Sequence, residues 1–331
     1  MVTAFVRRVN ERQSGNCVLN LAGCSREEIP FSTRTRRYRT ATLDPLDKFK
    51  IGTCAWSYED WRGVFYPEHL PPGDRLAFYA QHFHSVEVDS TFYATPSPKT
   101  ALHWYEVTPP DFVFVCKLPK EITHERRLRE AAEPLSAFLQ GIHPLGEKLG
   151  CVLIQVPPSF RPRQDDKALR AFLRELPGHV RFAIEFRHHD WHLPRIVQLL
   201  EEHRVCWAWT DVTPLNHQQE GAFEFLPQTT DFACVRLMGD LDKKYGDDGQ
   251  RLHSYCELLW PRDASLENWA TRLRQRTAEL SRILIAASNH FEGFAPRTCQ
   301  RLAALLDLPT RDLPAPGGDE PDAASGQMSL L

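Results

Sequence analysis

Short apolar runs alternate along the chain with longer segments whose apolar residues recur every three or four positions. The first pattern is typical of buried β-strands and the second of amphipathic helices. Strands are predicted at Lys50–Trp56, Ser85–Ser90, Phe112–Leu118, Cys151–Val156, Val180–Arg187, Val205–Asp211, Phe232–Gly239 and Arg282–Asn289. Helices are predicted at Asp74–Phe83, after the capping pair Ser97-Pro98, and at Pro134–Gln140, Asp165–Leu176, Leu193–His203, Ser265–Leu280 and Pro296–Leu306.

Eight strands that alternate with helices predict an α/β fold, a single (β/α)8 TIM-type barrel with a parallel sheet. One crossover departs from the ideal, because residues 212–231 after the sixth strand carry no convincing helical pattern. An open doubly wound sheet is the alternative fold. The phosphate fingerprint G-x-G-x-x-G that often accompanies it is absent.

The two ends of the chain differ from this repeating middle part. Residues 1–47 are arginine-rich with little apolar periodicity, and residues 309–331 are rich in Pro, Gly and Asp. We therefore expect a disordered basic extension at 1–47, the barrel at 48–308 and a flexible tail at 309–331. The basic segment could instead bind nucleic acid or be a transit peptide. Three glutamates in the segment weaken the transit-peptide interpretation, because such peptides are poor in acidic residues.

Composition is ordinary for a globular protein, with 42% hydrophobic and 25% charged residues and a formal net charge of -3. This charge gives no general attraction to nucleic acid, and no apolar stretch is long enough to span a membrane. The nine cysteines show no C-x-x-C pair, and five of them fall inside predicted strands. A cytoplasmic location is therefore expected, with these thiols acting as small buried hydrophobic groups.

Charged and amide side chains recur late in the predicted strands. They alternate with fully apolar positions, and since the apolar face must pack against helices, the polar set is assigned to the barrel interior. These residues are Glu87, Lys117, Gln155, Glu185, Arg187, Asp211, Arg236 and Asn289. The late position places them at the C-terminal mouth, where barrel enzymes have their active sites. The alternative is a set of buried ion pairs that only plug the barrel.

The chemistry of these groups indicates a small anionic ligand. Lys117, Arg187 and Arg236 are expected to bind a phosphate or carboxylate. Glu87 and Glu185 are the candidate catalytic acid and base, the more so if neighbouring charges push their pKa values apart. The other candidate substrate-binding residues are Trp56, Tyr58, Tyr93, Gln155, His188, Asn289 and His290.

No cofactor is predicted, because no short metal-ligand motif such as H-E-x-x-H occurs. A divalent metal is the alternative use of the acids, held by Glu87, Glu185, His188, Asp211 and His290. The adjacent His188 and His189 are expected to diverge, so that at most one of them reaches the pocket.

Several long segments resemble the DUF72 (YecE-like) family over about residues 50–308. They include Ile51-Gly-Thr-Cys-Ala-Trp-Ser-Tyr58, Val86-Glu-Val-Asp-Ser-Thr-Phe-Tyr93, Gln155-Val-Pro-Pro-Ser-Phe160, Glu185-Phe-Arg-His188 and Asn289-His-Phe-Glu-Gly-Phe-Ala-Pro296. The resemblance implies a TIM-type barrel, and the likeness of this family to sugar isomerases is one of fold. Two positions depart from the family pattern. Met238 stands where a histidine is usual, and His290 stands where paired asparagines are common.

Three kinds of function follow from these observations. The first is an enzyme, an isomerase or hydrolase that uses acid–base chemistry on a phosphorylated or carboxylated, sugar-like molecule. The second is a non-catalytic anion-binding protein. The third is an accessory protein of DNA metabolism, which the C-terminal residues suggest.

The chain ends in Gln327-Met-Ser-Leu330-Leu331, which resembles the peptides by which bacterial DNA-metabolism proteins dock on the replication sliding clamp. An ordinary C-terminus that happens to end in two leucines is the alternative. If the tail docks, a fluorescent peptide of these residues should bind clamp with micromolar affinity in a polarisation assay. Replacing Gln327 and Leu330 by alanine should abolish the binding. Equal binding by both peptides, or none by either, would contradict the docking.

Overall fold

The computed structural model describes residues 45–211, 225–240, 254–310 and 313. Within them lies one sheet in which all the pairs of neighbouring strands are parallel. Its strands are β1 (Phe49–Cys54), β2 (Ser85–Val88), β3 (Val113–Lys117), β4 (Leu149–Gln155), β5 (Phe182–Glu185), β6 (Val205–Trp207), β7 (Trp209–Thr210), β8 (Phe232–Leu237) and β9 (Arg282–Ala287). Their order in the sheet is β6-β5-β4-β3-β2-β1-β9-β8-β7.

The sheet is a barrel because its two end strands are parts of one segment. Only Ala208 separates β6 from β7. The first half pairs with β5, for example Ile184 with Trp207, and the second half pairs with β8, for example Trp209 with Val235. The predicted strand Val205–Asp211 is therefore the one that joins the two edges. The nine strands occupy eight positions around the ring, and the predicted (β/α)8 barrel is confirmed.

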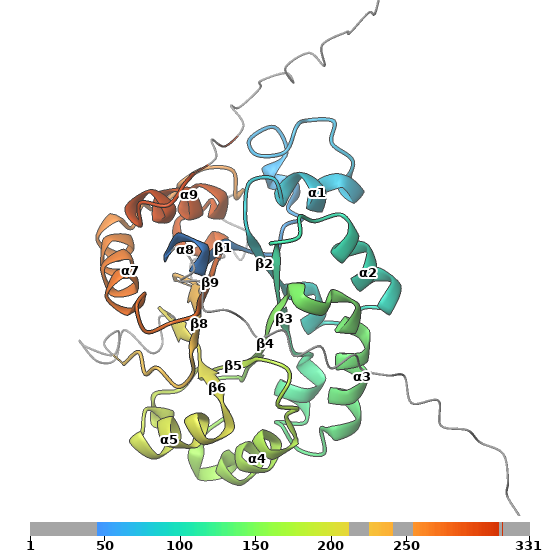
Figure 1. Cartoon of the computed structure of the whole chain (residues 1–331), viewed down its shortest axis with the longest axis vertical. Helices are drawn as coiled ribbons and strands as arrows, with labels where there is room; N and C mark the ends of the chain where they lie inside the picture. Colours follow the sequence, from blue (N-terminus) through green and yellow to red (C-terminus); the bar gives the residue numbers. More distant parts are fainter. Residues whose placement is uncertain (1–44, 212–224, 241–253, 311–312, 314–331) are drawn as a thin grey trace, which may run out of the picture. The chain divides into compact units, whose positions relative to one another are not determined.

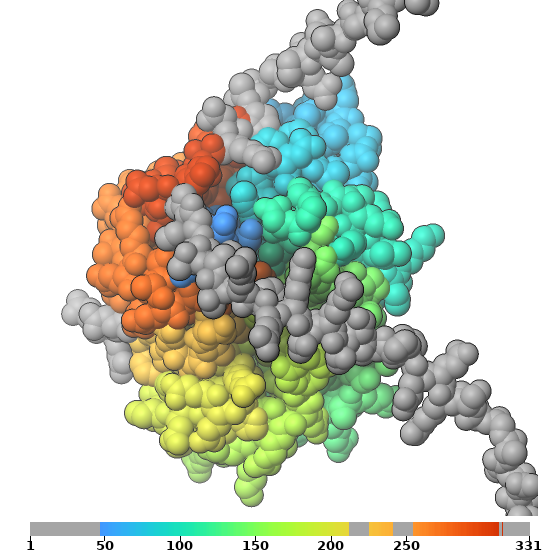
Figure 2. Space-filling view, viewed as in Figure 1, coloured from blue at the N-terminus to red at the C-terminus, as the bar shows by residue number. Residues whose placement is uncertain are grey.

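Helices cover the outside of the strands (Figure 1). They are α1 (Arg75–Tyr79), α2 (Pro98–Glu106), α3 (Ala132–Ile142), α4 (Pro162–Glu175), α5 (Pro194–His203), α7 (Asp263–Arg276), α8 (Asn289–Glu292) and α9 (Ala295–Leu305). Short helical turns are η1 (Pro45–Lys48), η2 (Glu59–Trp61), η3 (Pro72–Asp74), η4 (Asp89–Phe92), η5 (Glu121–Glu125, a π-turn), η6 (His143–Lys148) and η7 (His189–Trp191). Figure 2 shows the coloured segments following one another around the molecule in sequence order, as local β–α units require.

Local sequence explains the helix ends in part. The Ser97 side chain accepts a hydrogen bond from the Thr100 N–H at 3.1 Å, so the predicted cap of α2 is confirmed. The helix predicted over Asp74–Phe83 is shorter than expected, because the η3 turn includes Asp74 and the regular helix ends at Tyr79. After the sixth strand, residues 225–231 form no helix, and residues 212–224 lie outside the described residues.

The two faces of the strands separate as the alternation predicts. One cluster fills the barrel interior and contains Val113, Val115, Cys151, Leu153, Ala183, Cys206, Ala208, Phe232, Cys234 and Leu284. The alternate positions, such as Phe114, Ile154 and Ile184, belong to the large cluster between sheet and helices. The interior of the barrel is thus filled with side chains, and the polar residues are left for its C-terminal end.

The loop after β3 is held in a strained conformation. Arg127, Leu128 and Glu130 have φ values of 52°, 62° and 47°, in the left-handed region that non-glycine residues rarely adopt. The fully buried carboxylate of Asp165, in the first turn of α4, accepts bonds from Arg127 at 2.5 Å and from Arg129 at 2.9 Å. These bonds offset the backbone strain and tie the loops after β3 and β4 together.

Five cysteines predicted to act as buried hydrophobic groups are buried: Cys54, Cys116, Cys151, Cys206 and Cys234. Among the described residues, no helix combines the length and the apolar composition that crossing a membrane requires. The interpretations of residues 1–44 and of the C-terminal peptide 327–331 concern residues outside those described.

Gly52 marks a place where two strands approach closely. A Cβ atom there would lie 1.7 Å from the backbone oxygen of Ser85 on β2. We expect Gly52→Ala to lower the free energy of unfolding by about 3 kcal/mol or more, because the backbone of β2 must shift. Gly73→Ala is the matched control. Its Cβ would meet no atom within 4 Å, and it should change stability by less than about 0.5 kcal/mol. Equal unfolding midpoints in urea for the two variants would contradict the proposed strand contact.

Candidate functional site

Arg236, near the end of β8, joins two glutamates from distant strands. Its Nε and Nη2 atoms donate to the two carboxylate oxygens of Glu87 at 2.7 and 2.6 Å. Its Nη1 atom donates to Glu185 on β5, and lies 3.3 Å from the Gln155 amide oxygen on β4. Both carboxylates and the guanidinium are almost completely buried. Four predicted site residues, from four strands of the sheet, therefore form one network.

Arg187 extends this network toward the surface. Its Nε atom donates to Glu185 and its Nη2 atom donates to Gln155 at 3.1 Å. Its Nη1 atom has no protein partner among the described residues, and the side chain is 8% exposed. Arg187 thus resembles Arg236 in pairing with Glu185, but it retains donors that can still bind a ligand.

Lys117, the last residue of β3, is the third predicted cation. Its Nζ atom lies 3.4 Å from a carboxylate oxygen of Asp89 and 4.4 Å from the centroid of the Phe92 ring. A single long ion pair leaves most of the hydrogen-bonding capacity of an ammonium group unused. Lys117 and Arg187 are consequently better placed than Arg236 to contact an anion.

The two glutamates have pKa values that move in opposite directions. Burial raises the pKa of Glu87, and the nearby charge of Asp89 adds to this, although Arg236 opposes both. Burial also acts to raise the pKa of Glu185, but the guanidiniums of Arg187 and Arg236 outweigh it and lower this pKa. The network therefore separates two chemically identical groups into one that retains its proton more readily and one that stays ionised.

The balance of charge explains how so many ionic groups are buried here. When both carboxyls are ionised, Glu87 and Glu185 carry two negative charges, which match the two positive charges of Arg187 and Arg236. Each is hydrogen bonded to an oppositely charged neighbour, which removes most of the penalty for burial. Removal of one partner would leave an uncompensated charge and typically costs about 3–5 kcal/mol.

The predicted aromatic ligands differ in accessibility. Trp56 is half-buried and packs edge-on against Trp104, with ring centroids 5.7 Å apart. The Tyr58 hydroxyl donates to the Cys54 carbonyl at 2.9 Å, and its ring packs against Trp61. Tyr93 is 74% exposed. Only Tyr93 among the three predicted residues is open enough to stack freely on a ligand.

Three other predicted residues have partners of their own at the end of the barrel. The Asn289 amide oxygen accepts a 3.0 Å bond from the Ala295 N–H at the start of α9. His290 lies 2.9 Å from the Tyr255 hydroxyl. The Asp211 carboxylate accepts a 2.6 Å bond from the Met238 N–H, and burial raises its pKa to about 6. Asn289 and Asp211 therefore bind backbone N–H groups, and His290 contacts a tyrosine hydroxyl.

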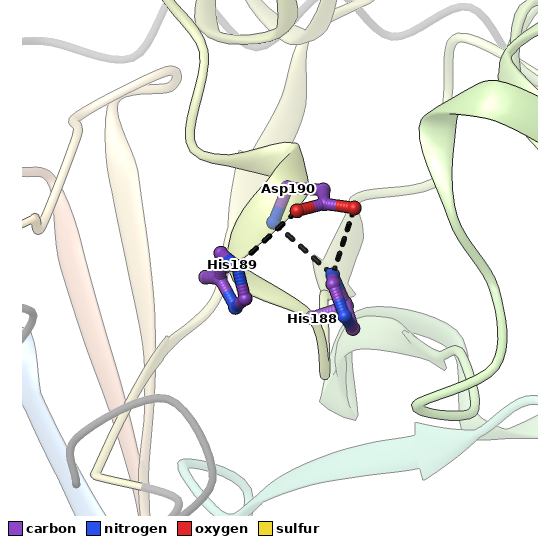
Figure 3. A group of neighbouring side chains, drawn as sticks. All are labelled: His188, His189 and Asp190. Carbon is purple, nitrogen blue, oxygen red and sulfur yellow. Dashed lines mark hydrogen bonds and ion pairs between the residues drawn. The ribbon is translucent and has the colours of Figure 1, made fainter. Parts of the chain in front are cut away.

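The expected metal set is not brought together. Of its five members, Glu87 and Glu185 bind arginines, and Asp211 and His290 have the partners just described. Within the described part of the chain, two other groups have metal-ligand spacing: Cys54, Glu87 and Asp89, and His188, His189 and Asp190. The prediction that His188 and His189 diverge is wrong. Their rings stack, with centroids 4.5 Å apart, and both contact the Asp190 carboxylate above them (Figure 3).

Sequence reasoning missed Asp89 and His124. Asp89 follows Glu87 by two positions, so the alternation of a strand continued by one residue would have placed it on the interior face. The π-turn η5 positions His124 beyond β3, where burial and the charges of Lys117 and Arg187 lower its pKa. Nothing in the local pattern of the sequence indicates that this histidine lies near both cations.

The structure is a (β/α)8 barrel with a charge-neutral ionic network at the C-terminal ends of its strands. The sequence profile of the family "Protein of unknown function DUF72" matches residues 50–323. The chain therefore belongs to the DUF72 family, as the segments quoted above predicted.

Named relatives and solved structures agree with this assignment. The UPF0759 protein YecE of Escherichia coli K12 is 36% identical over 138 residues, which cover 42% of this chain and 48% of YecE, about half its length. The UPF0759 protein YunF of Bacillus subtilis is 25% identical over 78% of this chain and 94% of its own. The crystal structure of a DUF72 family protein from Thermotoga maritima is similar, with a TM-score of 0.65 and 27% identity over 78% of this chain and 99% of that one.

Asp211 gives a test of the electrostatics at this end of the barrel. Its pKa is about 6 in the folded protein against an ordinary value of 3.8. Between these values the folded state binds more protons than the unfolded state, so this carboxyl lowers stability as pH rises from about 4 to 6. Asp211→Asn keeps the acceptor for Met238 but removes the charge. The variant should gain stability over the wild type at pH 8 and lose that advantage at pH 4, measured by urea unfolding.

Asp111→Asn removes a surface carboxylate and serves as the control. It should leave the pH dependence of the wild type unchanged. A stability difference between Asp211→Asn and the wild type that is the same at both pH values would contradict a raised pKa at this position.

Proposed function

We propose that this protein is an enzyme that uses acid–base chemistry on a small anionic molecule, phosphorylated or carboxylated and sugar-like, bound at the C-terminal mouth of the barrel. The observation that carries the proposal is the pair of nearly buried cations with unused donors, Lys117 and Arg187, beside carboxylates whose pKa values are shifted apart. Sites with these features are typical of functional pockets rather than of packing alone.

The anion contacts come from three neighbouring strands. Lys117 ends β3, Gln155 ends β4, and Arg187 follows β5, and these strands are adjacent in the sheet. The Gln155 amide oxygen binds Arg187, which leaves its amide hydrogens for a ligand oxygen. We call Lys117, Gln155 and Arg187 the anion arc. An ammonium, an amide and a guanidinium side by side suit the binding of a phosphate or carboxylate.

Proton transfer is assigned to the carboxylates on the β2 side of this arc. Glu87 and Asp89 have carboxylate oxygens within 4.8 Å of each other. The raised pKa of Glu87 suits a group that holds a proton, and Asp89, with 32% of its side chain exposed, is accessible to substrate. Glu185 is better suited to be the ionised partner of the two arginines. The geometry thus favours Asp89 over Glu185 as the second member of the acid–base pair.

The preference for a sugar-like or ring-containing substrate rests on the aromatic residues next to Lys117. The Phe92 ring faces the ammonium, and the adjacent Tyr93 is largely exposed. An apolar ring face beside a cation can pack on a ring that carries an anionic group. The class of enzyme, isomerase or hydrolase, is part of the same proposal.

A non-catalytic anion-binding protein is the second candidate. The observation that favours it is the saturation of Arg236, whose donors are directed at Glu87, Glu185 and Gln155 in a network that could serve only to shape the site. Incubation of each bound metabolite with the protein, followed by ¹H and ³¹P NMR, distinguishes the two, since only an enzyme converts its ligand.

Ligand binding can be tested by thermal shift with phosphorylated and carboxylated metabolites. A ligand that binds the arc should raise the melting temperature of the wild type. Lys117→Gln should weaken its binding by about 10- to 100-fold, the value of a charge-assisted hydrogen bond of about 1.5–3 kcal/mol. Lys120→Gln removes the same charge from an exposed side chain in the loop that follows β3 and should bind as the wild type does. Equal weakening in both variants, or no stabilising ligand at all, would contradict the proposal.

A further inference from the structure

The turn that follows β5 gathers three potential metal ligands outside the Arg236 network. A carboxylate oxygen of Asp190 lies 3.4 Å from His188 Nδ1, and the other lies 3.2 Å from His189 Nε2. One atom from each residue lies within 4.8 Å of the other two. Figure 3 shows the carboxylate above the two imidazole rings, with an interaction to each of them.

We propose that His188, His189 and Asp190 bind a divalent transition metal ion, Zn²⁺ by preference, with at least one coordination position left open. Two imidazoles and one carboxylate are the protein ligands of many catalytic zinc sites, and of non-haem iron sites with open positions. This site is independent of the anion arc proposed above, and it differs from the five-residue metal set expected from the strand ends.

The spacing of the ligand atoms suits a tetrahedral ion. Zinc binds imidazole nitrogen and carboxylate oxygen at about 2.0–2.2 Å, which places two ligands of a tetrahedron about 3.3–3.6 Å apart. The separation of His188 Nδ1 from one Asp190 oxygen is 3.4 Å, and that of His189 Nε2 from the other oxygen is 3.2 Å. Each is close to this range, and one atom from each of the three residues lies within 4.8 Å of the other two. His188 Nδ1 now accepts a long 3.2 Å bond from the Asp190 N–H, and a metal would replace that bond.

The turn that carries His188, His189 and Asp190 is anchored by the buried residue that follows it. Trp191, the next residue, is fully buried and donates from Nε1 to the Phe160 carbonyl at 2.8 Å. Its ring is stacked on Phe160 and on Phe186, with centroid distances of 5.3 and 4.9 Å. The three ligands therefore sit on a backbone that does not need to reorganise when the metal binds, which favours affinity.

The accessibility of the ligands also fits. The His188 side chain is 15% exposed, and its Nδ1 atom is directed at the Asp190 carboxylate and the Asp190 N–H. His189 and Asp190 have 44% and 47% of their side chains exposed, which lets a metal enter and leaves room for water. The other group with metal-ligand spacing, Cys54 with Glu87 and Asp89, is a poorer site because Arg236 and Lys117 already neutralise its acids.

The test is a titration of the chelator-treated, full-length protein with Zn²⁺ by calorimetry and with Co²⁺ by visible absorption, since Co²⁺ reports tetrahedral coordination. We expect one equivalent to bind. Loss of a residue that only supports a metal ligand typically lowers metal affinity about 10- to 100-fold. Asp190→Asn and His189→Ala each remove a direct ligand and should lower the affinity for the metal at least as much. His143→Ala removes an exposed histidine at the start of η6 and should bind metal as the wild type does.

Folding is monitored by circular dichroism and by the melting temperature without metal. Both should be unchanged in Asp190→Asn and His189→Ala, because the altered side chains are exposed and Trp191 anchors the turn. Absence of stoichiometric binding by the wild type would overturn the proposal. Retention of wild-type affinity in both ligand variants would overturn it as well.

Discussion

The ion pair between Arg236 and Glu87 is the constraint on which the C-terminal end of this barrel depends. It connects β8 to β2, which are separated in the sheet by β1 and β9, and both partners are almost wholly removed from water. A guanidinium buried alone would be prohibitively costly, so its position requires both glutamates. Once Arg236 is placed, the orientations of Glu87, Glu185 and Gln155 follow from its fork-shaped set of donors.

That constraint divides the charged groups of the mouth into two kinds. Arg236 and Glu185 neutralise one another inside the barrel and shape the site. Lys117, Arg187 and Asp89 lie at the edge of the same network and keep unused donors or exposed oxygens. The buried part creates a polar environment of fixed geometry, and the outer part can exchange its contacts with water for contacts with a ligand.

Two buried side chains fix the loops around the C-terminal end of the barrel. Asp165 binds two arginines of the strained loop after β3, and Trp191 anchors the turn after β5 between two aromatic rings. Strain is tolerated in such loops only where surrounding bonds determine the conformation. The β3, β4 and β5 side of the barrel, which carries both proposed ligand sites, therefore has a rigid rim.

Periodicity by itself determined the barrel, because the alternation of apolar positions depends only on local geometry. It identified the eight strand positions, the interior face with Val113 and Cys151, and the late polar residues. Of these polar residues, the structure gathers Glu87, Gln155 and Glu185 around Arg236. Tertiary structure alone decided which charges pair, since Glu87 and Arg236 are 149 positions apart. It also decided that Arg236 is saturated whereas Lys117 is not, and that His188 and His189 converge on Asp190. These features depend on distances in space between loops and strands. The spacing of residues along the sequence does not contain those distances.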